Sequence, residues 1–258
     1  MELNLFSALV LGLIQGFTEW LPISSSGHLV IAQKLLGIDA PPEFDIVIMA
    51  GTTLALIFYF RKKITRLLKG IAQMEKESLE YAKLILFAGV ATALIGFPGK
   101  LFFKSLFGQP LVVSVFILLT GVFLLIASRA KERAKLSSRN ACFIGVAQGI
   151  AIAPGISRSG STIGTAMLLG INPKDAAEFS FLIGAPAMAI ASGIEFLGAK
   201  GAGVEFSVLF IGTASAFVAG YASIGFFMKL LEKGKLAWFG YYCVAAGICF
   251  AIITSFLK

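Results

Sequence analysis

Charged and metal-ligating residues are scarce in this sequence of 258 residues. Charged side chains make up 14% of the chain, and histidine occurs once. The three cysteines, Cys142, Cys243 and Cys249, stand in apolar stretches without the short paired spacings of zinc or iron–sulfur sites, so we assign them to packing. No low-complexity tail or Pro/Ser-rich linker divides the chain, and we therefore expect a single domain over residues 1–258.

Apolar residues are abundant: 57% of the chain is hydrophobic, with 24 phenylalanines and 28 glycines. This composition is typical of a polytopic membrane protein and excludes an ordinary soluble domain. A membrane-spanning helix needs roughly 20 apolar residues. The sequence predicts six such spans, over residues 44–60, 82–98, 111–128, 177–197, 206–228 and 237–257. The predicted fold class is an all-α integral membrane protein. We interpret Trp20, Trp238, Tyr241 and Tyr242 as anchors at the membrane interface rather than catalytic groups.

Two further apolar stretches, 5–37 and 143–171, are interrupted in the middle. Pro22 breaks the first and Pro154 the second, and a Ser-rich segment follows each proline. Non-helical backbone is tolerated at membrane depth only where protein or water covers it. We therefore predict two re-entrant hairpins, each made of a helix, a break and a second helix.

The same pattern occurs twice, 133 residues apart. The blocks that begin at Gly12, Ile23 and Leu35 recur at Gly145, Ile156 and Leu168 without a gap. We therefore divide the chain into repeat one, about 5–128, and repeat two, about 141–257. The halves differ where polar groups are concentrated: Glu19 corresponds to Ile152, Ser25 to Arg158 and His28 to Ser161. A duplicated scaffold with unlike reactive groups suggests one site between the two halves.

The net charge of +8 comes from basic residues that lie between the predicted spans. Three loops are rich in them: Arg61, Lys62, Lys63, Arg66, Lys69 and Lys76; Arg129, Lys131, Arg133, Lys135 and Arg139; and Lys229, Lys233 and Lys235. The alternate loops hold only Lys100 and Lys104, or Lys200. The positive-inside rule places the rich loops in the cytoplasm, so the charge indicates a membrane and not a nucleic acid. The hairpins then enter from opposite sides, which makes the repeats inverted and both termini external.

The first hairpin carries a carboxylate and the single histidine. Gln15 and Glu19 are four residues apart and share one helix face. Ser24, Ser25 and Ser26 follow the break and lead to His28. Ionisable groups inside a membrane are costly and usually functional, so we interpret Glu19 and His28 as site residues rather than a buried polar pair.

The second hairpin carries an arginine in a Gly/Ser-rich break. A turn of this kind that opens a helix presents free backbone N–H groups to an anion, and Arg158 adds a planar set of donors suited to phosphate. The expected phosphate-binding side chains here are Ser157, Arg158, Ser159 and Thr162, with Ser24 and Ser26 from the first hairpin.

Together the two hairpins supply the groups that hydrolytic phosphoryl transfer needs. Arg158 would stabilise phosphoryl charge, and Glu19 or His28 would act as the general base and later acid. Either a serine attacks covalently or the base activates water; the sequence leaves both routes open. A site inside a membrane implies a lipid-linked phosphate or diphosphate. The alternative is a secondary transporter or flippase for a phosphorylated lipid or anion, since inverted repeats with broken helices are common in transporters. A purely structural membrane protein ranks last.

Two segments resemble the signatures of a known family. Residues 13–29 (LIQGFTEWLPISSSGHL) and 154–162 (PGISRSGST) are similar to the two motifs of the bacterial undecaprenyl-diphosphatases, the bacitracin-resistance family. The resemblance implies a catalytic glutamate at Glu19, a proposed nucleophile at Ser25, a histidine at His28 and a phosphate-binding arginine at Arg158. It also implies a multi-pass protein of the bacterial cytoplasmic membrane that hydrolyses undecaprenyl diphosphate to undecaprenyl phosphate and recycles the carrier of cell-wall polymers.

The resemblance further implies a divalent cation, Mg²⁺ or Ca²⁺. Gln15 stands where the family's acidic motif has Glu or Gln, so a site with two carboxylates is not expected. An amide can supply one oxygen ligand and a diphosphate can supply others. We expect Glu19, together with Gln15 and the substrate, to hold the cation. The Gly-rich spans would permit a homodimer.

Overall fold

The chain folds into helices throughout the part that the structure, a computed structural model, describes: residues 3–103, 106, 109–201 and 203–256. The α-helices are α1 Leu5–Glu19, α2 Ser25–Leu36, α3 Pro42–Tyr59, α4 Arg61–Ala72, α5 Lys76–Phe103, α6 Pro110–Ala127, α7 Ser138–Ile150, α8 Arg158–Leu168, α9 Pro173–Gly201, α10 Phe206–Glu232 and α11 Leu236–Phe256. These described residues contain no β-strand, and the prediction of an all-α protein is confirmed.

Six of the helices, α3, α5, α6, α9, α10 and α11, are long and apolar enough to cross a membrane. They coincide with the six predicted spans. Helix α5 begins at Lys76, six residues before the predicted start, because the helix continues through a polar turn that hydropathy alone leaves out. Residue 257, the end of the last predicted span, and Lys104 lie outside the described residues.

The two interrupted stretches form helix–break–helix hairpins, as predicted. In the first, α1 ends at Glu19, Pro22 lies in the break, and α2 begins after Ser24. The Ser24 hydroxyl accepts a hydrogen bond from the Gly27 N–H, which satisfies one of the free donors at a helix start. In the second, Ser157 caps α8 in the same way through the Gly160 N–H, at 3.0 Å.

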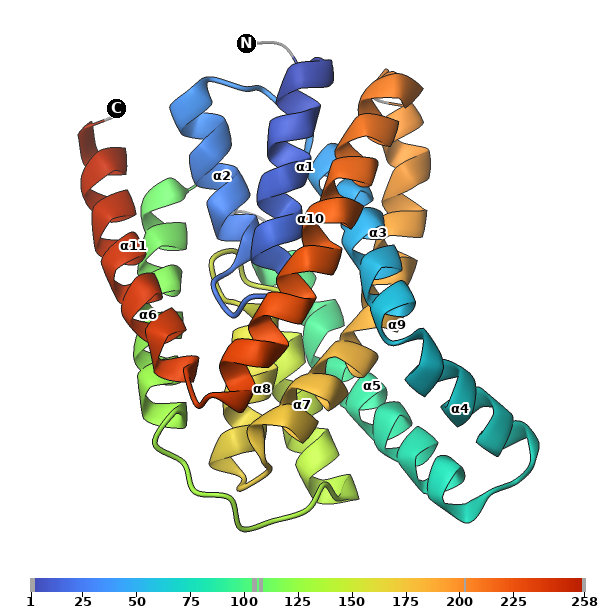
Figure 1. Cartoon of the computed structure of the whole chain (residues 1–258). Helices are drawn as coiled ribbons and strands as arrows, with labels where there is room; N and C mark the ends of the chain where they lie inside the picture. The colour runs from blue at the N-terminus through green and yellow to red at the C-terminus, as the bar shows by residue number, and fades with distance from the viewer. Residues whose placement is uncertain (1–2, 104–105, 107–108, 202, 257–258) are drawn as a thin grey trace.

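The hairpins lie in opposite halves of the molecule, and their breaks meet near the middle (Figure 1). The two chain ends lie on one side, whereas the loop from α6 to α7 and the turn from α4 to α5 lie on the other. The loops rich in basic residues therefore lie on the side of the molecule opposite the termini. The inverted relation of the repeats and the orientation across the membrane stay predictions.

Each hairpin packs on a spanning helix of the other predicted repeat. Helix α1 lies along α10, and α7 lies along α5. A Cβ atom on Gly12 would stand 2.3 Å from the Gly212 carbonyl oxygen, and one on Gly145 would stand 2.3 Å from the Ala88 carbonyl oxygen. Only glycine permits these approaches, which explains why both repeats carry glycine at this position. The two repeats are therefore interlocked.

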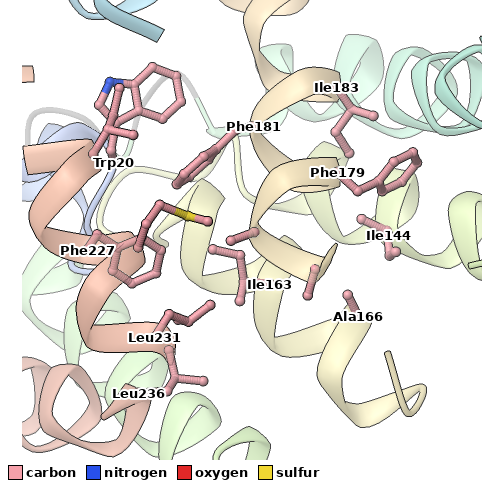
Figure 2. Packing of buried hydrophobic residues seen from close by; sticks show 14 of the residues in the cluster. Trp20, Ile144, Ile163, Ala166, Phe179, Phe181, Ile183, Phe227, Leu231 and Leu236 are labelled. Carbon is pink, nitrogen blue, oxygen red and sulfur yellow. The ribbon is translucent and has the colours of Figure 1, made fainter. Parts of the chain in front are cut away.

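The larger of two apolar clusters among the described residues includes Trp20 and Ile23 of the first break. Figure 2 shows Trp20 beside Phe181 of α9, with Phe227 of α10 next to it. The Trp20 and Phe181 rings meet edge to face with centroids 5.0 Å apart. We expected Trp20 to be an anchor at the membrane interface, and this prediction is wrong: its side chain is fully buried. Trp20 directly follows the inner end of α1, so its ring enters the protein interior.

Candidate functional site

The two breaks are joined by hydrogen bonds. The Ser159 hydroxyl donates to the Leu21 carbonyl at 3.1 Å, which connects the start of α8 to the end of α1. The Ser157 N–H donates to the Thr120 hydroxyl of α6 at 3.3 Å. These contacts fix the two signature segments against each other, and the polar side chains of both face one region.

Glu19 is the centre of this region. Its Oε1 accepts a hydrogen bond from Nη2 of Arg158 at 2.7 Å. Its Oε2 accepts from Nε2 of Gln15 at 2.9 Å and from the Ser25 hydroxyl at 2.5 Å. The Glu19 side chain is only 7% exposed and that of Arg158 16%, so the ion pair is largely shielded from solvent. The structure thus brings together Gln15, Glu19, Ser25 and Arg158 from both hairpins.

Arg158 is held on three sides. Its guanidinium lies 5.0 Å above the Trp20 ring, within the range of a cation–π contact. Nη2 also contacts the Met188 sulfur at 2.7 Å. In contrast, Nη1 is buried and has no hydrogen-bond partner among the described residues. A buried unpaired donor is costly, so a ligand oxygen that reached this nitrogen would satisfy it.

Gly184 of α9 leaves the room that the guanidinium occupies. A Cβ atom at this position would lie 1.9 Å from Nη1 of Arg158. Contacts this short cannot exist, so a side chain here would displace the arginine. Because Gly184 has no side chain, the Arg158 guanidinium can occupy this position.

Most of the predicted phosphate-binding hydroxyls already have structural partners. Ser24 and Ser157 cap helices, and Ser159 binds the Leu21 carbonyl. Thr162 donates to the Arg158 carbonyl and contacts the Ser180 hydroxyl. A further candidate, Ser26, lies 3.5 Å from the Ser24 hydroxyl. Ser25 differs from all of these because it bonds directly to the Glu19 carboxylate.

His28 lies apart from the Glu19 carboxylate. Its Nδ1 is 2.7 Å from the Ser24 carbonyl oxygen and its Nε2 is 2.8 Å from the Tyr242 hydroxyl of α11. The ring is stacked on Tyr242 and meets Phe250 edge to face. The structure therefore does not bring His28 into hydrogen-bond contact with the side chains of Gln15, Glu19, Ser25 or Arg158.

An apolar groove adjoins His28. It has a volume of about 320 Å³ and is formed by α1, α2 and one side chain of α11. The lining residues are Leu13, Ile14, Phe17, Thr18, His28, Ile31, Ala32, Leu35 and Phe250. Thr18 directly precedes Glu19 in α1, and the lining residues other than Thr18 and His28 are apolar.

Comparison with known proteins assigns the chain to a family. Residues 8–249 match the family model described as bacitracin resistance protein BacA. The chain belongs to this family. A relative from Carboxydothermus hydrogenoformans named undecaprenyl-diphosphatase is 39% identical, over 98% of each chain. Proteins of the same name from Christiangramia forsetii and Halothermothrix orenii are 37% and 38% identical over at least 98% of each chain.

The bacitracin-resistance family implies a divalent cation, and the donors present allow only part of its coordination shell. Glu19 and Gln15 are neighbours on α1, but Glu19 already pairs with Arg158. The described residues include no cluster of three or more His, Cys, Asp or Glu side chains that could hold a metal ion. These donors therefore fit a cation that brings further oxygen ligands with it, such as a diphosphate complex, and do not form a complete cage.

The sequence analysis missed four residues of the candidate site. Trp20, Gly184 and Met188 surround Arg158, and Tyr242 binds His28. We expected Tyr242 to be an interfacial anchor. Its hydrogen bond to His28 joins residues 214 positions apart, and no spacing rule within one helix can reveal such a contact.

Proposed function

We propose that this chain is an integral-membrane phosphatase that hydrolyses undecaprenyl diphosphate to undecaprenyl phosphate and inorganic phosphate. The observation that carries the proposal is the Glu19 carboxylate, which pairs with Arg158 through one oxygen and accepts a hydrogen bond from the Ser25 hydroxyl through the other. The name that these relatives carry, undecaprenyl-diphosphatase, agrees with this chemistry. The activity would recycle the carrier lipid of cell-wall polymers and confer resistance to bacitracin.

In the proposed reaction Arg158 binds the terminal phosphate. Its free Nη1 donates to one phosphoryl oxygen, and the first N–H groups of α8 favour the anion at the helix start. Charge that develops on the phosphoryl oxygens in the transition state is then met by fixed donors. The shielding of the pair strengthens this interaction because the local dielectric constant is lower than in water.

Glu19 acts as the general base in either of two routes. In the covalent route the Ser25 oxygen attacks the terminal phosphorus, its proton passes to Glu19, and the bond from this phosphorus to the bridging oxygen breaks. Undecaprenyl phosphate leaves, and water then hydrolyses the phosphoserine. In the direct route Glu19 takes the proton from a water molecule, which attacks instead. His28 is the alternative general base: the lone pair on its Nε2 would take the proton after movement of its side chain or of the substrate.

The polyprenyl tail would lie in the apolar groove between α1 and α2. The groove adjoins both Thr18 and His28, so it leads away from the polar site at the point where an isoprene chain would begin. Burial of apolar surface stabilises the bound tail by about 25 cal/mol per Å². A volume of about 320 Å³ suits the first few isoprene units and leaves the remaining chain in the bilayer.

A divalent cation, Mg²⁺ or Ca²⁺, would be held by Glu19, the amide oxygen of Gln15 and the diphosphate itself. Such an ion, when bound, neutralises charge on the diphosphate and makes its phosphate a better leaving group. Arg158 and Glu19 keep the roles given above. The cation requirement is tested with EDTA in the assay below.

The proposed location is the bacterial cytoplasmic membrane, with both termini external and the basic loops inside. The partners are the lipid substrate and the bilayer, and a homodimer is compatible with the Gly-rich helices. A transporter is disfavoured because the matched position of Glu19 in the second repeat is Ile152. An anion carrier has little need of a carboxylate and a serine beside its arginine.

The proposal is tested by phosphate release from a C55 polyprenyl diphosphate by purified protein in detergent, with and without EDTA. We expect cation-dependent release by the wild type and loss of release in Glu19→Gln. Because this substitution leaves Arg158 without its partner, the variant must elute as the wild type does in size exclusion. Lipid binding without any phosphate release by folded wild type would instead favour the transporter.

A further inference from the structure

His28 is fixed from two sides, by its own hairpin and by helix α11. One ring nitrogen faces the Ser24 carbonyl at 2.7 Å and the other faces the Tyr242 hydroxyl at 2.8 Å. A carbonyl oxygen can only accept a hydrogen bond, so Nδ1 must carry a proton. In the neutral ring Nε2 is then the acceptor, and the Tyr242 hydroxyl is its donor.

Helix α11 also sets the plane of the imidazole. The rings of His28 and Tyr242 are almost parallel, with 11° between their planes and centroids 5.7 Å apart. Phe250, two turns further along α11, meets His28 edge to face at 5.6 Å. Two aromatic contacts and one hydrogen bond from a single helix therefore determine where the basic nitrogen points.

We propose that Tyr242 is a positioning residue that acts on turnover through His28. Its hydroxyl holds the lone pair on Nε2 and keeps the ring at the mouth of the groove that the lipid tail would enter. This inference rests on the proposed phosphatase activity. Without the tyrosine hydroxyl, Nε2 loses its donor, and the ring is free to exchange tautomers or to rotate.

His28 is the only histidine in the sequence, so NMR signals from labelled histidine report on this ring alone. Protein labelled with ¹⁵N-histidine and carrying a tag without histidine gives the NMR signals of one imidazole. We expect a neutral ring protonated on Nδ1 in the wild type. Tyr242→Phe keeps the aromatic ring but removes the donor, so the Nε2 signal should shift. Tyr241→Phe is the matched control, since Tyr241 is 63% exposed and has no hydrogen bond or ring contact in the described structure.

The same variants are then compared in turnover of the C55 diphosphate. Loss of one hydrogen bond predicts a decrease in kcat of about fivefold for Tyr242→Phe, and KM should change little. In a His28→Ala background the same substitution should have no further effect.

Three results would overturn the role of Tyr242. These are an unchanged Nε2 signal, an unchanged kcat, or a decrease in kcat that is equally large without His28. Absence of phosphate release by the wild type would instead contradict the proposed function, and the NMR comparison would still report whether Tyr242 holds the imidazole.

Discussion

Arg158 and Glu19 form a salt bridge of 2.7 Å across 139 residues of sequence. One partner comes from each hairpin, so the pair exists only when both hairpins are in place. Removal of one partner from a largely buried pair typically costs about 3–5 kcal/mol, because the other charge is left uncompensated. The pair therefore stabilises the contact between the halves and also presents the arginine to a phosphate.

Arg158→Lys tests the geometry of the donors and retains the positive charge. A lysine cannot bind Glu19 and a phosphoryl oxygen through a planar pair of nitrogens. We expect kcat/KM for the C55 diphosphate to fall roughly 100-fold, the cost of a lost transition-state donor. Thermal unfolding in detergent should show a smaller loss of stability than for Arg158→Ala. Activity within a few-fold of the wild type would contradict a specific role for the guanidinium.

Gly184→Ala tests whether the position of Arg158 depends on the absence of a side chain at residue 184. The added methyl group would lie 1.9 Å from Nη1 and must displace the guanidinium. We expect turnover to fall by about tenfold or more, as small misplacements of a binding group do. Gly193→Ala on the same helix is the control, because a Cβ atom there meets no atom within 4 Å. Equal activities of the two variants would show that the position of Arg158 tolerates the shift.

Ser25→Ala separates the covalent from the direct route. The covalent route predicts that turnover falls by roughly 1000-fold or more, since no other group replaces the nucleophile. The direct route predicts a loss of only about tenfold, the value of one hydrogen bond to Glu19. Both are measured as phosphate release, with acid-quenched samples examined by mass spectrometry for a phosphorylated serine. A phosphorylated wild type supports the covalent route, and substantial activity of the alanine variant excludes it.

Ala32→Phe tests the groove as the site of the lipid tail. The larger side chain would fill part of the 320 Å³ volume and exclude isoprene units from it. We expect KM for the C55 diphosphate to increase about tenfold, the cost of excluding roughly 55 Å² of apolar surface, and kcat to be nearly unchanged. Ala93→Phe on the exposed face of α5 is the control. A similar KM in both variants would place the tail elsewhere.

Much of the fold follows from local properties of the sequence. The six long helices follow from apolar runs, because a buried or lipid-facing helix needs continuous hydrophobic residues. The two hairpins follow from Pro22 and Pro154 with the capping serines after them. The polar segments that meet in the site were also identifiable, because polar groups are rare in an apolar chain and each has to be accounted for.

The parts that escaped prediction depend on contacts between distant helices. Nothing local distinguishes Tyr242, which binds His28, from the exposed Tyr241 beside it. Gly184 was equally hidden, because the need for glycine arises from an arginine of another helix. Trp20 was misjudged because aromatic residues near the end of a membrane helix usually lie at the interface, and this helix ends inside the protein.

The packing of α1 on α10 also determines the order in which the protein can be built. Gly212 lies 200 positions after its contact Gly12, so the ribosome makes the partner of α1 long after α1 itself. At typical rates of translation this delay is roughly 10–40 s. Throughout that time the face of α1 that carries Gly12 lacks its native partner α10. Lipid or the insertion machinery must cover this face. Helix α1 thus reaches its final place only after a helix made much later in synthesis.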